Sequence, residues 1–155
     1  MPPQGNPRAA IEVSLDIAAS PQVLWATFAD LDKWPRWSPD IQSVRWASGA
    51  VWTLGAQLEL TLDLPLPARR WSGTATITEM QPAVSVAWET VYPLDVTVIH
   101  SYRFKPSGSA TVLSIREAYY GNAVLFYRLS RFPGQRQKTF ETALKNLKAY
   151  LQGGS

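Results

Sequence analysis

The sequence predicts an α+β domain in which a curved antiparallel sheet packs against one long C-terminal helix. Apolar and polar residues alternate from Ile11 onward in run after run, and prolines and glycines separate the runs. After Gly121 the apolar spacing changes from every second residue to every third or fourth residue. A sheet with one apolar face must cover that face, and the amphipathic segment at the C-terminus is long enough to do so.

The composition is that of one folded domain with many aromatic rings. The chain of 155 residues is 46% hydrophobic and 17% charged, which excludes a wholly disordered protein. It contains seven tryptophans, each able to bury on the order of 200 Å². Such a chain has either a very aromatic core or a pocket lined with rings. It has no cysteine, which excludes disulfides, a thiol nucleophile and a cysteine metal site.

The N-terminal residues carry no structural or targeting signal. Residues 1–10 are rich in proline, glycine and polar amides and are expected to form a flexible arm, so the single folded domain is expected to span residues 11–152. The first residues lack the apolar stretch of a signal peptide, and no apolar run approaches the roughly 18 residues of a membrane span. We therefore expect a cytoplasmic protein with no stable membrane insertion.

The first strand and two short helical elements follow in order. Apolar residues at every second position predict a half-buried strand over Ile11–Ile17. Ser20 and Pro21 are an N-cap and a first-turn proline, which predict a short helix ending near Phe28. The segment Lys33–Asp40 contains two prolines, so we expect a single helical turn or a compact loop there.

The middle of the chain predicts six further strands separated by turn residues. Pro106 and Gly108 mark a hairpin turn between the last two. The expected strands are Ile41–Ala47, Gln57–Leu64, Trp71–Met80, Ala83–Thr90, Val96–Lys105 and Ala110–Tyr120.

The C-terminal part has helical spacing. Because Pro133 and Gly134 interrupt it, we expect either two helical pieces, Asn122–Arg131 and Gln135–Leu151, or one kinked helix. The apolar stripe of the second piece consists of Phe140, Ala143, Leu144, Leu147 and Leu151.

Basic residues are concentrated in the same part of the chain. We interpret them as the solvated face of a helix, with attraction of an acidic ligand or an anionic surface as the alternative. The net charge of only +3 gives no indication of nucleic-acid binding. The basic residues are Arg128, Arg131, Arg136, Lys138, Lys145 and Lys148, accompanied by the single acidic residue Glu141.

Four stretches that span nearly the whole domain resemble the START-like (SRPBCC) superfamily, and within it the bacterial branch named after polyketide cyclases and dehydrases. One departure is Ala110, where the usual hairpin pattern has a second glycine. The stretches are Ile17–Pro21 with Trp25, Phe28, Asp30 and Trp34; Trp37–Pro39; His100–Phe104 with Gly108, Thr111, Glu117 and Gly121; and Ala143–Lys145 with Leu147 and Lys148.

The resemblance implies the helix-grip fold, about seven strands wrapped around the C-terminal helix, with a ligand cavity between them. Members bind lipids, polyketides and other apolar molecules, so we expect binding of a lipid-like, polyketide-like or aromatic small molecule. A dry, empty cavity of about 300 Å³ would cost roughly 7 kcal/mol, which favours an occupied one. The candidate ligand-binding residues are Trp25, Phe28, Trp37, Leu60, Leu62, Trp71, Trp88, His100, Tyr102, Glu117, Tyr119, Phe126, Phe132 and Phe140. Phe126, Tyr127 and Phe132 are expected to form a lid over the mouth.

His100 and Glu117 are the candidate catalytic residues. Alternation turns both inward on adjacent strands, where cross-strand neighbours interact. A structural or ligand-anchoring pair is one interpretation, and the alternative is an acid–base pair of a polyketide cyclase, aromatase or dehydratase. One histidine without cysteine makes a zinc site improbable, and no nucleotide-binding motif is present, so no metal or cofactor is expected.

Overall fold

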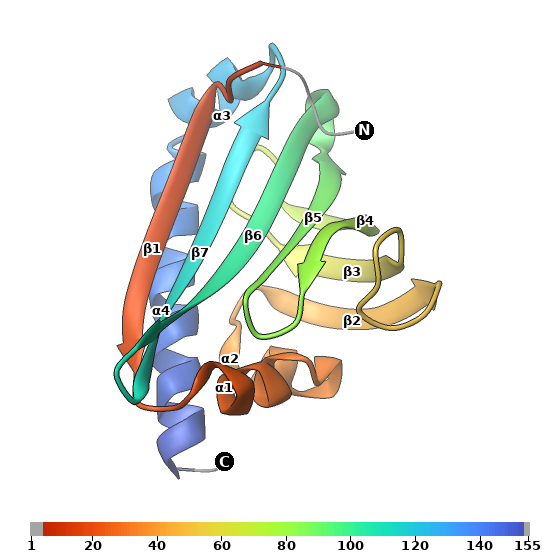
Figure 1. The fold of residues 1–155 in the computed structure, drawn as a ribbon. Helices are drawn as coiled ribbons and strands as arrows, with labels where there is room; N and C mark the ends of the chain where they lie inside the picture. The colour runs from red at the N-terminus through yellow and green to blue at the C-terminus, as the bar shows by residue number, and fades with distance from the viewer. Residues whose placement is uncertain (1–4, 154–155) are drawn as a thin grey trace.

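The computed structural model describes residues 5–153, in which seven strands form one antiparallel sheet. The strand order is β1-β7-β6-β5-β4-β3-β2, so the first strand lies beside the last and β2 forms the opposite edge (Figure 1). The strands are β1 Ala9–Ile17, β2 Ile41–Ser48, β3 Gln57–Asp63, β4 Arg70–Gln81, β5 Ser85–Tyr92, β6 Val96–Ser107 and β7 Ala110–Tyr120.

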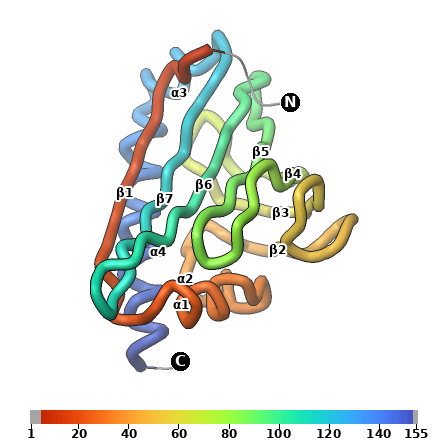
Figure 2. The backbone as a smooth tube through the Cα atoms, in the orientation of Figure 1, coloured from red at the N-terminus to blue at the C-terminus, as the bar shows by residue number. Residues whose placement is uncertain are grey.

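One long helix and several short ones complete the fold. Figures 1 and 2 show α1 and α2 at one end of the sheet and α3 at the other, with α4 running behind β1 and β7. This is the α+β helix-grip arrangement that the sequence predicted. The helices are α1 Pro21–Phe28, α2 Trp34–Trp37, α3 Val124–Leu129 and α4 Phe132–Gly153, and two 3-10 turns are η1 Leu31–Lys33 and η2 Pro93–Asp95.

Local chemistry explains where the short helices begin. The Ser20 hydroxyl accepts a hydrogen bond from the backbone N–H of Val23 at 3.2 Å, with Pro21 in the first turn, as predicted. Asp30 caps η1 through the backbone N–H of Asp32. The proline of α2, Pro35, also lies in a first turn, where its missing N–H costs nothing.

Two predicted boundaries are wrong. Ala9 and Ala10 are not part of an arm, because they pair with Tyr119 and Ala118 within β1; residues 1–4 of that predicted arm lie outside the described residues. Pro133 and Gly134 do not interrupt the long helix but form its first turn. The helical conformation is interrupted just before them instead, at Arg131, whose φ is 61°.

Aromatic rings fill much of the space between the sheet and the helices. The Phe28 ring, which is fully buried, lies with its centroid 4.6–6.1 Å from those of six other rings. Most of the tryptophans therefore serve packing. The six neighbours of Phe28 are Trp25, Trp34, Trp37, Trp52, Tyr102 and Phe104.

The apolar stripe of α4 is buried against the sheet as predicted, with Leu144 1% exposed. We expect Leu144→Ala to lower the free energy of unfolding by about 2–5 kcal/mol because it leaves a cavity under the helix. The adjacent Lys145 is exposed, so Lys145→Ala is the matched control. Urea denaturation of both variants measures the difference, and equal stabilities would contradict this packing.

Candidate functional site

A small pocket lies between the sheet, α2 and α4. Its volume is about 30 Å³, about the room that one water molecule takes in the liquid. Side chains from four strands or their ends (β2, β3, β5 and β6), from α2 and from α4 meet there. The lining residues are Trp34, Ser38, Asp40, Ile41, Leu60, Leu62, Trp88, Thr90, Tyr92, His100, Tyr102, Arg136 and Phe140.

The size of this pocket corrects one expectation. The cavity is where the resemblance implied, but the aromatic rings described above leave far less space than about 300 Å³. A void of 30 Å³ costs about 0.7 kcal/mol at about 24 cal/mol per Å³. A pocket of this size can stay empty at little cost, so its volume does not favour an occupied cavity, and the polar groups around it are the remaining indication of a ligand.

A buried ion cluster forms one wall of the pocket, with Arg136 at its centre. The Arg136 guanidinium donates from Nε and Nη2 to the two carboxylate oxygens of Glu117, at 3.1 and 3.0 Å. Its Nη1 donates to Asp40 at 2.7 Å, and the other oxygen of Asp40 accepts from the Ser38 hydroxyl at 2.7 Å. Arg136 and Glu117 are 1% and 0% exposed. The cluster therefore joins α4, β7 and the segment before β2.

His100 is held beside this cluster by Glu117. The two residues are directly opposite each other on β6 and β7, and Nδ1 of His100 lies 2.9 Å from Oε2 of Glu117. The imidazole stacks on Trp88 with centroids 4.7 Å apart and an angle of 8°, and Phe140 meets it edge-on at 5.2 Å. Both flanking rings line the pocket, so the orientation of the imidazole is set from three sides.

The charges of the cluster are set by each other. Burial raises the pKa of Glu117, but the positive charge of Arg136 and the hydrogen bond from His100 outweigh burial and hold that pKa well below its usual range. Burial lowers the pKa of Arg136, and the charges of Glu117 and Asp40 more than compensate and raise it. Tyr119 donates to Glu117 at 2.5 Å, and burial together with that carboxylate raises its pKa. Glu117 is therefore a carboxylate and Arg136 a cation at neutral pH.

Two polar atoms at the pocket have no hydrogen-bond partner within residues 5–153. They are Nε2 of His100 and the Thr90 hydroxyl, on residues that are 8% and 4% exposed. Buried polar atoms are normally paired, because an unpaired one costs about 1–3 kcal/mol. Since ionised Glu117 can only accept, Nδ1 of His100 carries the proton. Nε2 of the neutral ring is then an acceptor.

The structure brings together part of the predicted site. Six predicted ligand-binding residues line the pocket, and Glu117 and Tyr119 lie behind His100 in the same hydrogen-bonded cluster. The six lining residues are Leu60, Leu62, Trp88, His100, Tyr102 and Phe140.

The remaining predicted residues lie elsewhere. Trp25, Phe28 and Trp37 belong to the aromatic packing around α1. Trp71 covers Gly73 and donates its indole N–H to Val91.

None of the residues predicted as a lid lines the pocket. Phe126 is 56% exposed on the outer side of α3 and does not reach the pocket. Phe132 is fully buried between Tyr119, Tyr127 and Tyr92, so it is part of the core.

The central residue of the site is not among the site residues that the sequence predicts. Arg136 was assigned to the solvated basic face, but it is buried. It lies four residues before Phe140, so it continues the apolar stripe of α4 by one turn, and an arginine on a buried stripe is a signal for an ion pair. Asp40 and Thr90 were missed because neither stands in a distinctive pattern. The other missed lining residues are Trp34, Ser38, Ile41 and Tyr92.

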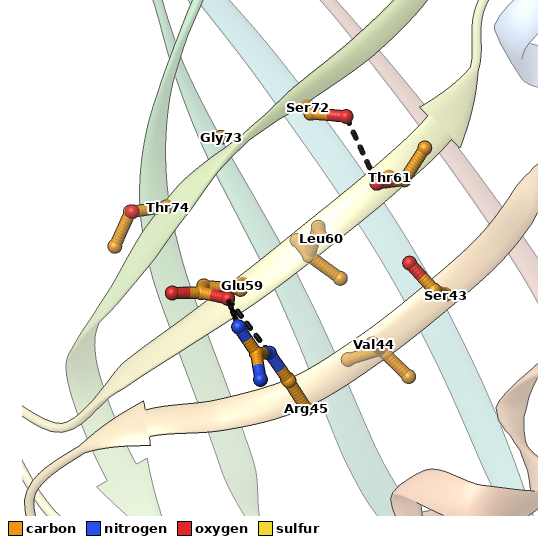
Figure 3. A pocket seen from close by; sticks show the side chains of 9 residues that line it. All are labelled: Ser43, Val44, Arg45, Glu59, Leu60, Thr61, Ser72, Gly73 and Thr74. Atoms are coloured by element: carbon orange, nitrogen blue, oxygen red, sulfur yellow. Dashed lines mark hydrogen bonds and ion pairs between the residues drawn. The ribbon is translucent and has the colours of Figure 1, made fainter.

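A larger hollow of about 500 Å³ lies on the outer face of β2, β3 and β4 (Figure 3). Four of its polar side chains pair with one another: Arg45 with Glu59 at 2.7 Å, and Thr61 with Ser72 at 2.9 Å. Figure 3 shows these pairs lying across the strands. Among the described residues, this hollow brings together no unpaired buried group, so it is not the candidate site.

Comparisons with known proteins agree with this architecture. Residues 8–152 match the model of the family described as polyketide cyclase / dehydrase and lipid transport. The chain belongs to this family, which confirms the predicted START-like resemblance. No curated protein matches.

Solved structures with the same fold include proteins of different backgrounds. A START superfamily protein from Mycobacterium smegmatis has a TM-score of 0.69 at 13% identity, covering 92% of this chain and 98% of that one. Ara h 8.0201 has a TM-score of 0.71 at 13% identity, with 93% and 97% covered. DynU16, from the dynemicin biosynthetic locus, has a TM-score of 0.70 at 14% identity. The match covers 96% of this chain and 49% of DynU16. These identities show the fold alone.

Two further properties bear on the class of protein. Among residues 5–153, no group of three or more histidine, aspartate or glutamate side chains is arranged to hold a metal ion. No helix in the described part of the chain is long and apolar enough to cross a membrane.

We expect Arg136→Met to lower the free energy of unfolding by about 3–5 kcal/mol, because it leaves two buried carboxylates without their cation. Chemical denaturation at neutral pH measures the loss. Arg128→Met is the matched control, since Arg128 is exposed and its loss should change stability by less than about 0.5 kcal/mol. An Arg136→Met protein as stable as this control would contradict the cluster.

The depressed pKa of Glu117 predicts how stability depends on pH. A carboxyl whose folded pKa lies below its unfolded value of about 4.3 contributes its full stabilisation above that pH and loses it as the pH falls toward the folded pKa. Carbon-13 NMR of the glutamate carboxyls should show Glu117 still ionised at about pH 4, where an ordinary glutamate is more than half protonated. A titration midpoint for Glu117 at or above about 4.3 would contradict the assignment.

Proposed function

We propose that this protein binds an apolar, preferably aromatic, small molecule that carries one hydrogen-bond donor, such as a phenolic hydroxyl. The family fold supports binding of this class of molecule. The observation that carries the proposal is Nε2 of His100, a buried acceptor that has no partner among the described residues, in a pocket walled by Trp88, Tyr102 and Phe140. The donor of the ligand would satisfy this atom, and Thr90 could add a second hydrogen bond.

The direction of that hydrogen bond follows from the ion cluster. Glu117 keeps the proton of His100 on Nδ1 and leaves Nε2 as the acceptor. A ligand hydroxyl therefore suits the site better than a ligand carbonyl. A ligand carboxylate suits it poorly, because Asp40 and Glu117 carry two negative charges against the single positive charge of Arg136.

The small volume sets a second requirement. A pocket of about 30 Å³ holds the polar group of a ligand but not its apolar body, so binding must displace side chains. The aliphatic wall formed by Ile41, Leu60 and Leu62 lies on β2 and β3 at the edge of the sheet. β2 has no strand on its outer side, so outward movement there breaks no interstrand hydrogen bond on that side.

Catalysis on a polyketide-like substrate is the second candidate. It is supported by the Glu117–His100 geometry, in which a carboxylate orients an imidazole whose other nitrogen faces the pocket, as a general base requires. Glu117 is also bound by Arg136 and Tyr119, so much of its charge stabilises groups other than His100. Binding therefore ranks first. A cyclase or dehydratase would lose turnover in His100→Gln while it keeps ligand affinity.

The proposal predicts a preference for 2-naphthol over naphthalene, two ligands that differ by one hydroxyl. The added hydrogen bond should improve affinity by about 2- to 12-fold, the range that corresponds to about 0.5–1.5 kcal/mol. Isothermal titration calorimetry of the purified protein with both compounds measures the ratio. Thr90→Val, which removes the hydroxyl without changing the shape, should reduce the ratio.

Thr78→Val is the matched control, because Thr78 is exposed on β4, and it should leave the ratio unchanged. Equal affinities for the two naphthalenes in the unmodified protein, or no binding of either, would overturn the proposal.

A further inference from the structure

The short helix α3 presents large apolar side chains to solvent. Leu125, Phe126 and Leu129 are 58%, 56% and 71% exposed, while Val124 and Tyr127 on the other side of the helix are buried. Single exposed apolar residues are ordinary, but three on one six-residue helix indicate a contact surface.

The neighbouring turn η2 extends the same surface. Leu94 is 58% exposed, and its φ of 68° is a conformation that leucine rarely adopts. Tyr127 donates to the carbonyl of Pro93 at 2.7 Å, which fastens η2 to α3. We call Leu94, Leu125, Phe126 and Leu129 the apolar tip. It lies at the end of the molecule opposite α1 and α2 (Figures 1 and 2).

Arginines surround the apolar tip. Arg8 and Arg128 line a hollow of about 230 Å³ together with Leu125, and Arg131 lies two residues after the end of α3. These three arginines are exposed and make no ion pair within residues 5–153. Asp95, in η2, is the one acidic residue on α3, η2 and the residues that link α3 to α4, so the positive charges outnumber the negative ones there.

We propose that the apolar tip docks on the surface of an anionic lipid membrane. Protruding leucine and phenylalanine side chains insert at the boundary between headgroups and acyl chains, and neighbouring arginines pair with lipid phosphates. A protein partner would need a surface that matches both features, whereas an anionic bilayer supplies them everywhere. Docking of this kind is reversible and needs no membrane-spanning helix.

The apolar tip is also connected to the candidate site. The Tyr127 ring lies 4.8 Å from Phe132, which lies 6.2 Å from Tyr92, and Tyr92 lines the pocket. Docking would therefore bring the membrane within three rings of the pocket. The docking surface stands on its own exposed residues, so it does not rest on the proposed ligand.

Co-sedimentation with lipid vesicles tests the docking surface. The protein should bind vesicles of phosphatidylcholine with phosphatidylglycerol and leave vesicles of phosphatidylcholine alone. Phe126→Glu should weaken the binding at least tenfold. Arg128→Glu should weaken it at least fivefold, since each basic residue near such a surface adds about 1 kcal/mol, or about fivefold. High salt should weaken the binding of the unmodified protein.

Matched controls change equally exposed residues elsewhere. Leu54→Glu alters a leucine that is 67% exposed in the β2–β3 loop, and Lys145→Glu alters an exposed cation on α4. Both should bind vesicles as the unmodified protein does, and circular dichroism checks that each variant is folded. If the unmodified protein binds no anionic vesicles, or if the tip variants bind like the controls, the proposal is overturned and the surface belongs to a protein partner.

Discussion

The ion pair between Arg136 and Glu117 determines how the rest of the interior is arranged. Removing two such charges from water costs several kcal/mol for each ion, and only good geometry with further hydrogen bonds offsets it. Here the guanidinium meets both oxygens of Glu117 and one of Asp40, while Tyr119 and His100 satisfy the remaining positions on Glu117. The pair therefore fixes α4 on β7 and, through Asp40, fixes the start of β2.

The properties of the pocket follow from the same interaction. Glu117 assigns the proton of His100 to one nitrogen and leaves the other facing the pocket, where the proposed ligand would meet it. The Trp88 ring holds the imidazole flat against it. Such a site is rigid in its polar part and, on the side of β2 and β3, lined by aliphatic residues at a free sheet edge. The rigid polar part would select which ligand binds, and movement of the aliphatic edge would make room for the apolar body of the ligand.

The two ends of the molecule differ in what their aromatic and aliphatic residues do. At the α1 and α2 end, rings pack on Phe28 and are largely withdrawn from water. At the α3 end, leucine and phenylalanine side chains point outward beside unpaired arginines. Stability alone accounts for the first arrangement. It does not account for the second, because exposing these side chains contributes nothing to folding. The proposed contact of the α3 end with an apolar, negatively charged surface would account for it.

By itself, the sequence determined the order of strands and helices along the chain and the inward pairing of His100 with Glu117. Both depend on local periodicity, and the two-residue turn at Gly108 and Ser109 sets the β6–β7 register. The tertiary structure alone decided that Arg136 is buried and that the cavity is small. Arg136 is buried because its partners Glu117 and Asp40, 19 and 96 residues away in the chain, neutralise it. The volume depends on how rings from distant segments interlock, a property of packing that no local pattern encodes.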